Sequence, residues 1–206
     1  MAKVKLTRPE MKRQRDALGR FQRYLPMLKL KQQQLQLMVR QAQQKLNDAK
    51  RELDAAEAAF DPYRRILADR AGVNLKDLAE PEEVKVGRRN IAGVRVPVFE
   101  EVLFPEVNYS IFSTPAWVDR TLLDMRSLSE RHAKQDILHR QLHLLQGELT
   151  KVVQRVNLFE KIKIPDCKDT IRRIRIKLGD ESTSAVCRSK IAKGKLMKMA
   201  AEVSMI

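Results

Sequence analysis

A seven-residue apolar repeat over the first 60 residues constrains the fold of this chain more than any other feature. Alternating steps of three and four residues from Met11 meet an apolar residue at all but two of the positions reached. A 3.5-residue period held over many turns predicts a left-handed supercoil against a partner helix. The positions are Met11, Gln14, Leu18, Phe21, Leu25, Leu28, Gln32, Leu35, Val39, Ala42, Leu46, Ala49, Leu53, Ala56 and Phe60.

The first helix is predicted over residues 7–70. Thr7 is a suitable N-cap, and Pro9 falls near the first turn, where its missing N–H is harmless. Pro26 lies inside the helix, and Pro62 lies near its far end. Proline removes a backbone hydrogen bond, so we expect a kink at Pro26 and a bend near Pro62.

A second helix is predicted over residues 116–178, opening at Trp117 after Pro115. The apolar phase slips around 135–138, which predicts a local disturbance of the supercoil. Pro165 interrupts the repeat, and Gly179 is expected to end or loosen the helix. The basic tail, 179–206, is then expected to fray or to form a weaker helix. The regular part of the stripe is Leu138, Leu142, Leu145, Leu149, Val152, Val156 and Phe159.

Residues 71–115 lack the heptad repeat, are richer in proline and glycine, and are predicted to form a small head. Alternating apolar residues indicate two short strands within about 84–100, joined by a turn at Ala92-Gly93. Pro97 would then face an unpaired edge. The fold class is therefore mainly α: a long antiparallel two-helix left-handed coiled coil with a central head that contains a β-hairpin. In this pairing, residue i lies opposite roughly residue 178 − i.

The positive charge of the chain is concentrated at its two ends. The formal net charge is +15, and residues 1–40 and 151–206 carry the excess of Lys and Arg, whereas 41–150 are nearly balanced. The hairpin topology brings both basic segments to the end distal to the head. That end is expected to seek nucleic acid, an anionic membrane or an acidic protein socket.

The sequence contains no sign of catalysis, of a metal site or of a cofactor site. It has neither a P-loop nor a G-x-G-x-x-G motif, and His139 and His143 lack the glutamate and third ligand of a zinc site. Cys167 and Cys187 are too far apart on one helix to be bridged, so reduced thiols are expected. No apolar run is long enough to span a membrane, and the N-terminus lacks an apolar signal core, which favours a cytosolic location.

Several segments, in the right order along nearly the whole chain, resemble the D subunit of the V/A-type rotary ATPases. The matching residues are Leu6-Thr7-Arg8, Leu28-Lys29-Leu30-Lys31, the head segment 90–97, Arg155-Val156-Asn157-Leu158-Phe159-Glu160, Ile164-Pro165, Thr170-Ile171 and Ile174. The chain departs from the family pattern at Ala92, where methionine is usual.

This resemblance implies a non-catalytic central-stalk rotor shaft. Its termini would enter the catalytic hexamer of A and B subunits, and its other end would bind the F subunit and the C/d subunit on the membrane rotor ring. The complex would make or use ATP while moving ions, and the chain would belong to its soluble, membrane-peripheral sector. Residues expected to face the hexamer are Thr7, Arg8, Arg13, Arg15, Arg20, Arg155, Arg172, Arg173 and Arg175. Residues expected to contact stalk partners are Ile91, Gly93, Val94, Val96 and Pro97.

Two other interpretations of the residues remain open. A basic coiled coil could bind nucleic acid, although few aromatic residues accompany the basic ones and no binding motif is present. A generic scaffold protein would also show these heptads. Tight binding of random DNA would favour the first interpretation, and co-purification with a nucleotide-binding hexamer would exclude the second.

Overall fold

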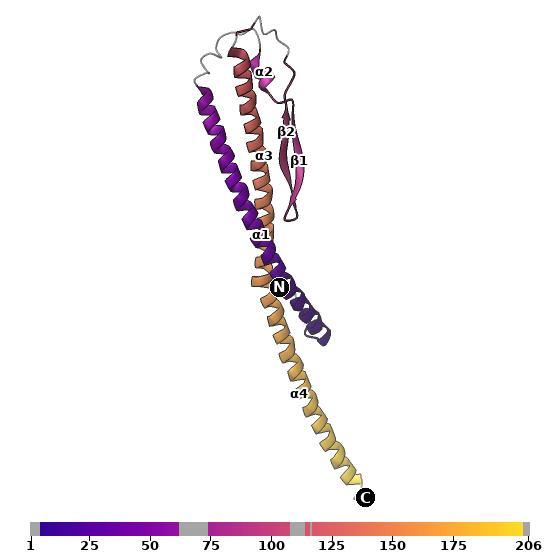
Figure 1. The fold of residues 1–206 in the computed structure, drawn as a ribbon. Helices are drawn as coiled ribbons and strands as arrows, with labels where there is room; N and C mark the ends of the chain where they lie inside the picture. The colour runs from indigo at the N-terminus through magenta and orange to yellow at the C-terminus, as the bar shows by residue number, and fades with distance from the viewer. Residues whose placement is uncertain (1–4, 62–73, 108–113, 116, 204–206) are drawn as a thin grey trace. The chain divides into compact units, whose positions relative to one another are not determined.

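The structure is a computed structural model that describes residues 5–61, 74–107, 114–115 and 117–203, with side chains described as far as residue 197. The described part of the chain is mainly helical and contains one two-stranded sheet. The chain divides into two compact units, residues 1–30 with 153–206 and residues 31–152. The elements are α1 (Arg8–Phe60), α2 (Leu75–Ala79), β1 (Glu83–Ile91), β2 (Val94–Leu103), α3 (Trp117–Asn157), the π-helical turn η2 (Leu158–Lys163) and α4 (Ile164–Val203) (Figure 1).

Helix α1 begins where the sequence predicts. The carbonyl of Thr7 accepts the N–H of Met11 at 3.0 Å, and Pro9 occupies the first turn. The helix continues through Pro26, although the proline deprives the carbonyl four residues earlier of its N–H partner. The kink expected there stays a prediction. Pro62 and the rest of the segment to residue 70 lie outside the described residues.

The heptad stripe of α1 is the face that the helix buries. Each of its fifteen positions, from Met11 to Phe60, is buried or half-buried, and most residues between them are exposed. Burial is deepest at Leu35, at 0% exposed, and at Leu46, at 2%. The repeat therefore identifies the packing face correctly, and the coiled-coil prediction is confirmed.

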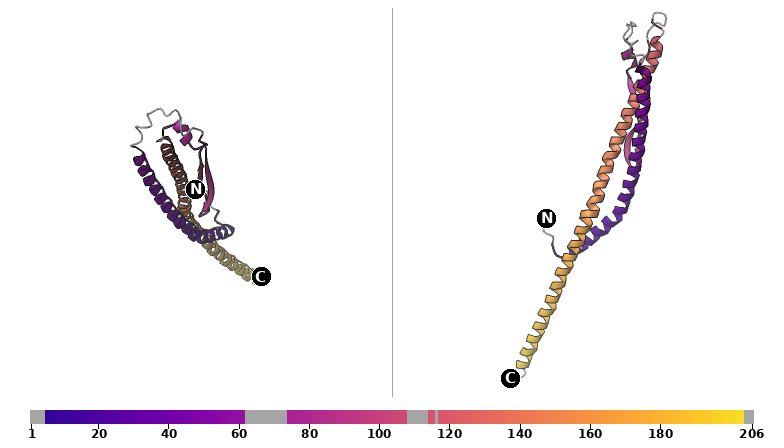
Figure 2. Two further views of the ribbon diagram at one scale, coloured as in Figure 1. Left: turned by 45° about the horizontal axis from the view of Figure 1, so that its top comes forward. Right: turned by 90° about the vertical axis from the view of Figure 1, so that its left-hand side faces the viewer.

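In the unit of residues 31–152, α1 and α3 lie side by side and antiparallel (Figures 1 and 2). Arg131 donates from Nη1 to the carbonyl of Glu52 at 3.1 Å, and His132 Nε2 lies 3.2 Å from Glu57 Oε1. These pairs place Glu52 and Glu57 opposite α3 residues five and eleven positions later than the 178 − i rule predicts.

Helix α3 packs against two neighbours, which explains the apparent phase slip at 135–138. Ile137 is 5% exposed and lines two hollows between α3 and the hairpin. Leu138 lines only the second of these, which residues of α1 also line. One apolar stripe serves α1 and a second serves the hairpin. If only one partner helix is assumed, the two overlapping apolar stripes look like a break in a single heptad repeat.

The head contains the predicted hairpin. β1 and β2 pair antiparallel from Glu83 with Leu103 to Ile91 with Val94, with an irregularity between Lys85 and Val86. The turn residues Ala92 and Gly93 have φ of 51° and 81°. Two successive positive φ values characterise the type I′ turn, whose twist matches that of the flanking strands.

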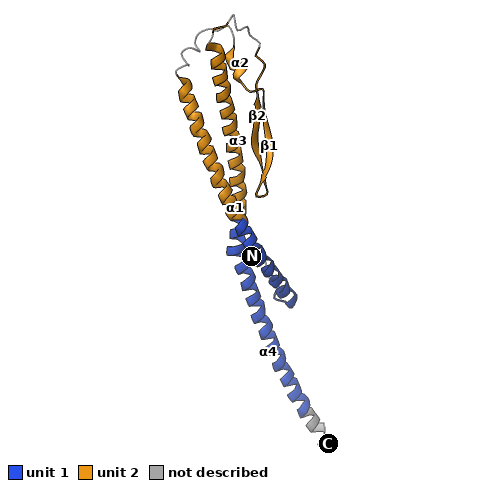
Figure 3. Ribbon diagram, in the orientation of Figure 1, with its two compact units in different colours: residues 1–30, 153–206 blue, residues 31–152 orange. Residues whose placement is uncertain are grey.

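In the second unit, α1 contacts η2 itself. The rings of Phe21 and Phe159 have centroids 5.0 Å apart, and Lys29 Nζ lies 2.8 Å from Glu160 Oε1 (both within the blue unit of Figure 3). The N–H of Ile164 donates to the carbonyl of Phe159, five residues earlier, which is the π-helical pattern.

The π-helical turn accounts for the interruption of the apolar repeat that is expected at Pro165. Without an N–H, Pro165 cannot satisfy an earlier carbonyl, and its ring would crowd the preceding turn of an α-helix. The wider turn accommodates it and inserts one residue. The inward residues then run Val156, Phe159, Ile164, Cys167 and Ile171, so a single five-residue step keeps the stripe on one face.

Helix α4 continues through Gly179 to Val203, so of the two alternatives expected at Gly179 a helix end is wrong. The hydroxyls of Ser182 and Thr183 donate to the carbonyl of Gly179 at 2.7 and 3.1 Å. A helical glycine lowers stability by only about 1 kcal/mol, which the flanking turns outweigh. Among the described helices, none has a stretch long and apolar enough to cross a membrane.

Candidate protein-interaction surfaces

The predicted shaft residues all lie in the unit of residues 1–30 and 153–206. Every one of the nine is exposed. Thr7 immediately precedes α1, and Arg155 lies in the last turn of α3. The other arginines are Arg8, Arg13, Arg15 and Arg20 on α1 and Arg172, Arg173 and Arg175 on α4.

These arginines are largely unneutralised within the described part of the chain. Arg13 has the one ion pair that the structure shows for them, 3.3 Å from Glu10 and on the same helix, with its side chain 79% exposed. An exposed pair of this kind contributes little to stability. The surface is therefore a set of hydrated guanidinium groups, which suits bidentate pairing with carboxylates of another molecule.

The second half of α4 presents apolar side chains that no described residue of its unit covers. Every side chain from 179 to 197 is exposed. Val186 is 55% exposed, Ile191 is 61% and Leu196 is 67%. Scattered exposed leucines are ordinary, but a whole helical segment without a buried face has no tertiary packing of its own to stabilise it.

The five predicted head residues differ in how far they can reach a partner. Gly93 is exposed at the turn, and Ile91 and Pro97 are half-buried. Val94 and Val96 are 8% and 1% exposed, because their side of β2 packs within the unit. Alternation along the strand predicts two faces but does not say which one is inward. Partner contact at this turn stays a prediction. Of the five residues, Gly93, Ile91 and Pro97 are exposed enough to make it.

Arg126 of α3 ties three parts of the head together, and sequence reasoning missed it. Its Nε donates to the carbonyl of Leu78 at 3.1 Å, and its Nη2 donates to the carbonyl of Pro105 at 2.6 Å. Its guanidinium also lies 5.1 Å from the ring centroid of Phe104. No local pattern marks such a residue, because its partners are backbone carbonyls far away in sequence.

A small apolar cluster completes the attachment of α2 to α3. The side chains of Leu75 and Ala79 pack with Val118 and Leu122, which are 0% and 4% exposed. Thr121 is buried beside them and donates to the carbonyl of Trp117 at 2.8 Å. These contacts attach α2 to the start of α3.

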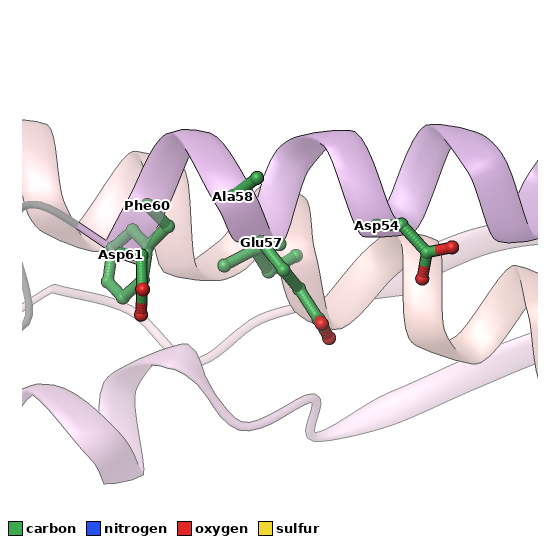
Figure 4. A pocket seen from close by; sticks show the side chains of 6 residues that line it. Asp54, Glu57, Ala58, Phe60 and Asp61 are labelled. Atoms are coloured by element: carbon green, nitrogen blue, oxygen red, sulfur yellow. The ribbon is translucent and has the colours of Figure 1, made fainter.

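The hollow near the end of α1 has an acidic rim. It measures about 500 Å³ and includes Asp54, Glu57 and Asp61 in its lining (Figure 4). In the described part of the chain, no group of three or more His, Cys, Asp or Glu side chains is arranged to hold a metal ion. His139 and His143, weighed as a metal pair, are both exposed on α3.

The two cysteines have different surroundings. Cys167 is buried and Cys187 is exposed, and both are free thiols. Burial raises the pKa of the Cys167 thiol, and the negative charge of Asp166 adds to this rise. Buried thiols of this kind are chemically inert, and their packing is what they contribute.

Comparison with known proteins identifies the family. The family model for the D subunit of ATP synthases matches residues 10–194. The D subunit of a V-type ATP synthase from Borreliella burgdorferi is 34% identical over 198 residues, which are 96% of this chain and 97% of that protein.

Two further relatives agree with this match. The D subunit of the V-type ATP synthase of Chlamydia pneumoniae is 34% identical over 94% of this chain and 93% of its own length. That of Chlamydia muridarum is 33% identical over 96% and 98%. A family match over most of the sequence, together with these relatives, shows that this protein belongs to the family of ATP synthase D subunits.

Proposed function

We propose that this chain is the central-stalk rotor shaft of a V/A-type ATPase or ATP synthase and carries no catalytic residue itself. It transmits torque between the catalytic A/B hexamer and the rotor ring that moves ions through the membrane. Its partners are the A and B subunits, the F subunit of the central stalk and the C/d subunit on the ring. It works in the soluble sector, on the cytoplasmic side of the membrane.

The burial of the whole heptad stripe of α1 is the observation that carries this proposal. A supercoiled pair of helices resists bending and twisting more than a single helix does, and torque transmission needs that stiffness. The unneutralised arginines from Thr7–Arg20 and Arg155–Arg175 supply a cationic surface for an acidic socket in the hexamer.

Rotation itself is the decisive test. The chain is assembled with A, B and F subunits, and the hexamer is fixed to a surface. A bead is attached through an Arg95→Cys substitution in a Cys187→Ser background. Arg95 is exposed beside the hairpin turn, and Cys187 is the exposed natural thiol. ATP should drive unidirectional stepping of the bead. ATP hydrolysis with a stationary bead would refute the proposed role as a rotor shaft.

The cationic surface has its own test. Arg13, Arg15, Arg20, Arg172, Arg173 and Arg175 are changed together to Gln. The matched control removes the same charge from Arg40, Lys45, Lys50, Arg51, Lys76 and Lys134 of the other unit. Hexamer affinity should fall only in the first variant, most strongly at low salt, because screening weakens these contacts. Equal affinity of both variants at low salt would reject the role of these arginines.

A further inference from the structure

Large apolar side chains are exposed on both helices at the level of the π-helical turn. On α1, Tyr24 is 55% exposed and Met27 is 66% exposed. On η2, Leu158 is 39% exposed and Ile162 is 50% exposed. The turn has no fully buried residue, although it carries two of these side chains. Their positions in the heptad decide whether they are scattered or form one surface.

The inward rings of Phe21 and Phe159 show how the two segments are aligned. Their centroids are 5.0 Å apart, so this part of α1 lies against η2 within the blue unit of Figure 3. In a heptad lettered a to g, inward residues occupy a and d, and both rings are at d. Tyr24 and Ile162 each follow one of these rings by three residues, which places both at the flanking position g.

An ion pair marks the opposite flank. Lys29 directly follows the inward Leu28, and Glu160 directly follows the inward Phe159, so both occupy the other flanking position, e. Their side chains meet, with Nζ 2.8 Å from Oε1. Because the two e positions meet on one flank of the pair, the two g positions lie together on the other.

The four apolar side chains therefore form one patch across the seam between the helices. Met27 and Leu158 occupy position c, which lies beside g on the outer surface of each helix. Flanking positions of a two-helix coil usually carry charges. Single exposed apolar residues are ordinary, whereas a contiguous apolar patch marks an interaction site. The patch is defined as Tyr24, Met27, Leu158 and Ile162.

The charges around this patch are mainly positive. Residues 17–47 of α1 contain no acid. On the flank of the patch, the heptad places the exposed side chains of Arg20, Arg155 and Lys163, and one exposed acid, Asp166. In the described part of the chain, none of these four has an ion-pair partner. Three cations against one acid leave a positive rim, which attracts carboxylates.

We propose that the patch binds an amphipathic helix of a partner protein, with an apolar stripe bordered by carboxylates. The stripe packs across the seam as the third helix of a local bundle, in which helix axes lie about 8–10 Å apart. The bordering carboxylates pair with Arg20 and Arg155, which selects the partner. A second copy of the chain would bring a positive rim against a positive rim, and like charges oppose that pairing.

The test uses the full chain and a fluorescent peptide that lactam bridges on its outer face hold helical. The peptide carries leucine along one face, with glutamate on both borders of that face. One comparison peptide replaces these glutamates with lysine. Another has the same composition, but its leucines are distributed around the helix. Anisotropy should show binding of the first peptide alone, with an affinity that falls as salt increases.

Two pairs of variants connect the binding to the patch. Ile162→Ser should weaken peptide binding by roughly tenfold, because an apolar contact is lost. Ile176→Ser is its control: Ile176 is 57% exposed and lies two residues after the inward Ile174, on the outer face of α4. Arg155→Gln should weaken binding several-fold, whereas Arg188→Gln, also exposed but distant on α4, should not. Circular dichroism checks that each variant keeps its helical content.

Several outcomes would overturn the proposal. Equal binding of the peptide with distributed leucines would mean that charge alone attracts it. Equal binding of the lysine peptide would remove the role of the positive rim. Equal affinity of Ile162→Ser and the unmodified chain would place the peptide elsewhere. Lack of binding at about 1 mM, the weakest affinity such a contact would need, would remove the site.

Two other occupants have their own signatures. Self-association of the chain that Ile162→Ser abolishes would assign the patch to a second copy. Binding to phosphatidylserine vesicles that Ile162→Ser abolishes, without binding of the peptide, would assign it to an anionic membrane. All these measurements need only this chain, and rotation is measured separately, so failure here leaves the rotor proposal standing.

Discussion

The rings of Phe21 and Phe159 meet with centroids 5.0 Å apart and planes tilted by 45°. Phe159 is the second residue of the π-helical turn η2, and Phe21 belongs to the heptad stripe of α1. The contact therefore fixes the turn against the opposite helix. Tilted aromatic pairs at this distance stabilise by about 0.5–1.5 kcal/mol beyond their buried area.

Phe159→Ala should destabilise this unit by about 1–3 kcal/mol, because a half-buried ring is lost along with its aromatic partner. Chemical denaturation followed by circular dichroism measures the change. Leu158→Ala is the control: Leu158 is adjacent and 39% exposed, and its loss should have less than about half the effect. Equal losses in both variants would mean that the ring contact contributes nothing particular.

Pro165→Ala should leave the π-helical turn in place. The inward positions Phe159 and Ile164 are five residues apart with or without the proline, so a plain α-helix would rotate Ile164, Cys167 and Ile171 out of the packing face. We expect the hydrogen bond from the Ile164 N–H to the Phe159 carbonyl to persist in a structure of the variant. A regular α-helix there would show that the proline alone creates the turn.

Arg126→Lys should loosen the head while leaving the coiled coil intact. A single ammonium group cannot reproduce the planar fork that reaches the Leu78 and Pro105 carbonyls and covers Phe104. The cost should be about 1–3 kcal/mol. It should appear as faster hydrogen exchange in α2 and the hairpin. Arg120→Lys, whose side chain is 77% exposed, should change neither region.

The hairpin turn offers a pair of substitutions with opposite signs. Ala92→Asn should stabilise by about 0.5–1 kcal/mol, because asparagine tolerates the positive φ of 51° that alanine holds at a cost. Gly93→Ala should destabilise by about 1–2 kcal/mol at φ of 81°. Thermal melting compares the two. A stabilising Gly93→Ala would contradict the type I′ geometry.

The thiols should react at very different rates. Iodoacetamide should modify the exposed Cys187 well before the buried Cys167, whose raised pKa keeps the thiol protonated. Because the folded-state pKa is the higher one, the stabilisation linked to Cys167 is full below the pKa of the unfolded thiol. It is lost as the pH rises through the folded pKa. Cys167→Ala should remove that alkaline dependence, and Cys187→Ala should not.

Sequence reasoning succeeded where the pattern is local. The heptads of α1, the capping residue Thr7 and the Ala92-Gly93 turn all follow from neighbouring residues. It failed where two partners or distant backbone decide the outcome. Ile137 serves two neighbours, Val94 and Val96 turn inward, and Arg126 reaches carbonyls from other elements.

The sequence did not predict the continuation of α4 past Gly179 or the π-helical turn before Pro165, and the reason is different. Gly179 and Pro165 are helix-breaking residues by propensity, and their weak local preference is outweighed by the helix around them. The sequence predicted which residues make up the candidate surfaces but not which of them are exposed. Only the folded chain shows that the arginines stand exposed while two of the hairpin valines do not.

The π-helical turn also has a mechanical consequence. Along most of α1 and α4, the backbone carbonyls are held by a ladder of short i to i−4 bonds, which resists winding and unwinding. In η2 that ladder is wider and lacks the N–H of Pro165. A twist applied along this helix of the coiled coil would concentrate in η2. The six residues from Leu158 to Lys163 would thus act as the torsional spring of an otherwise stiff helix.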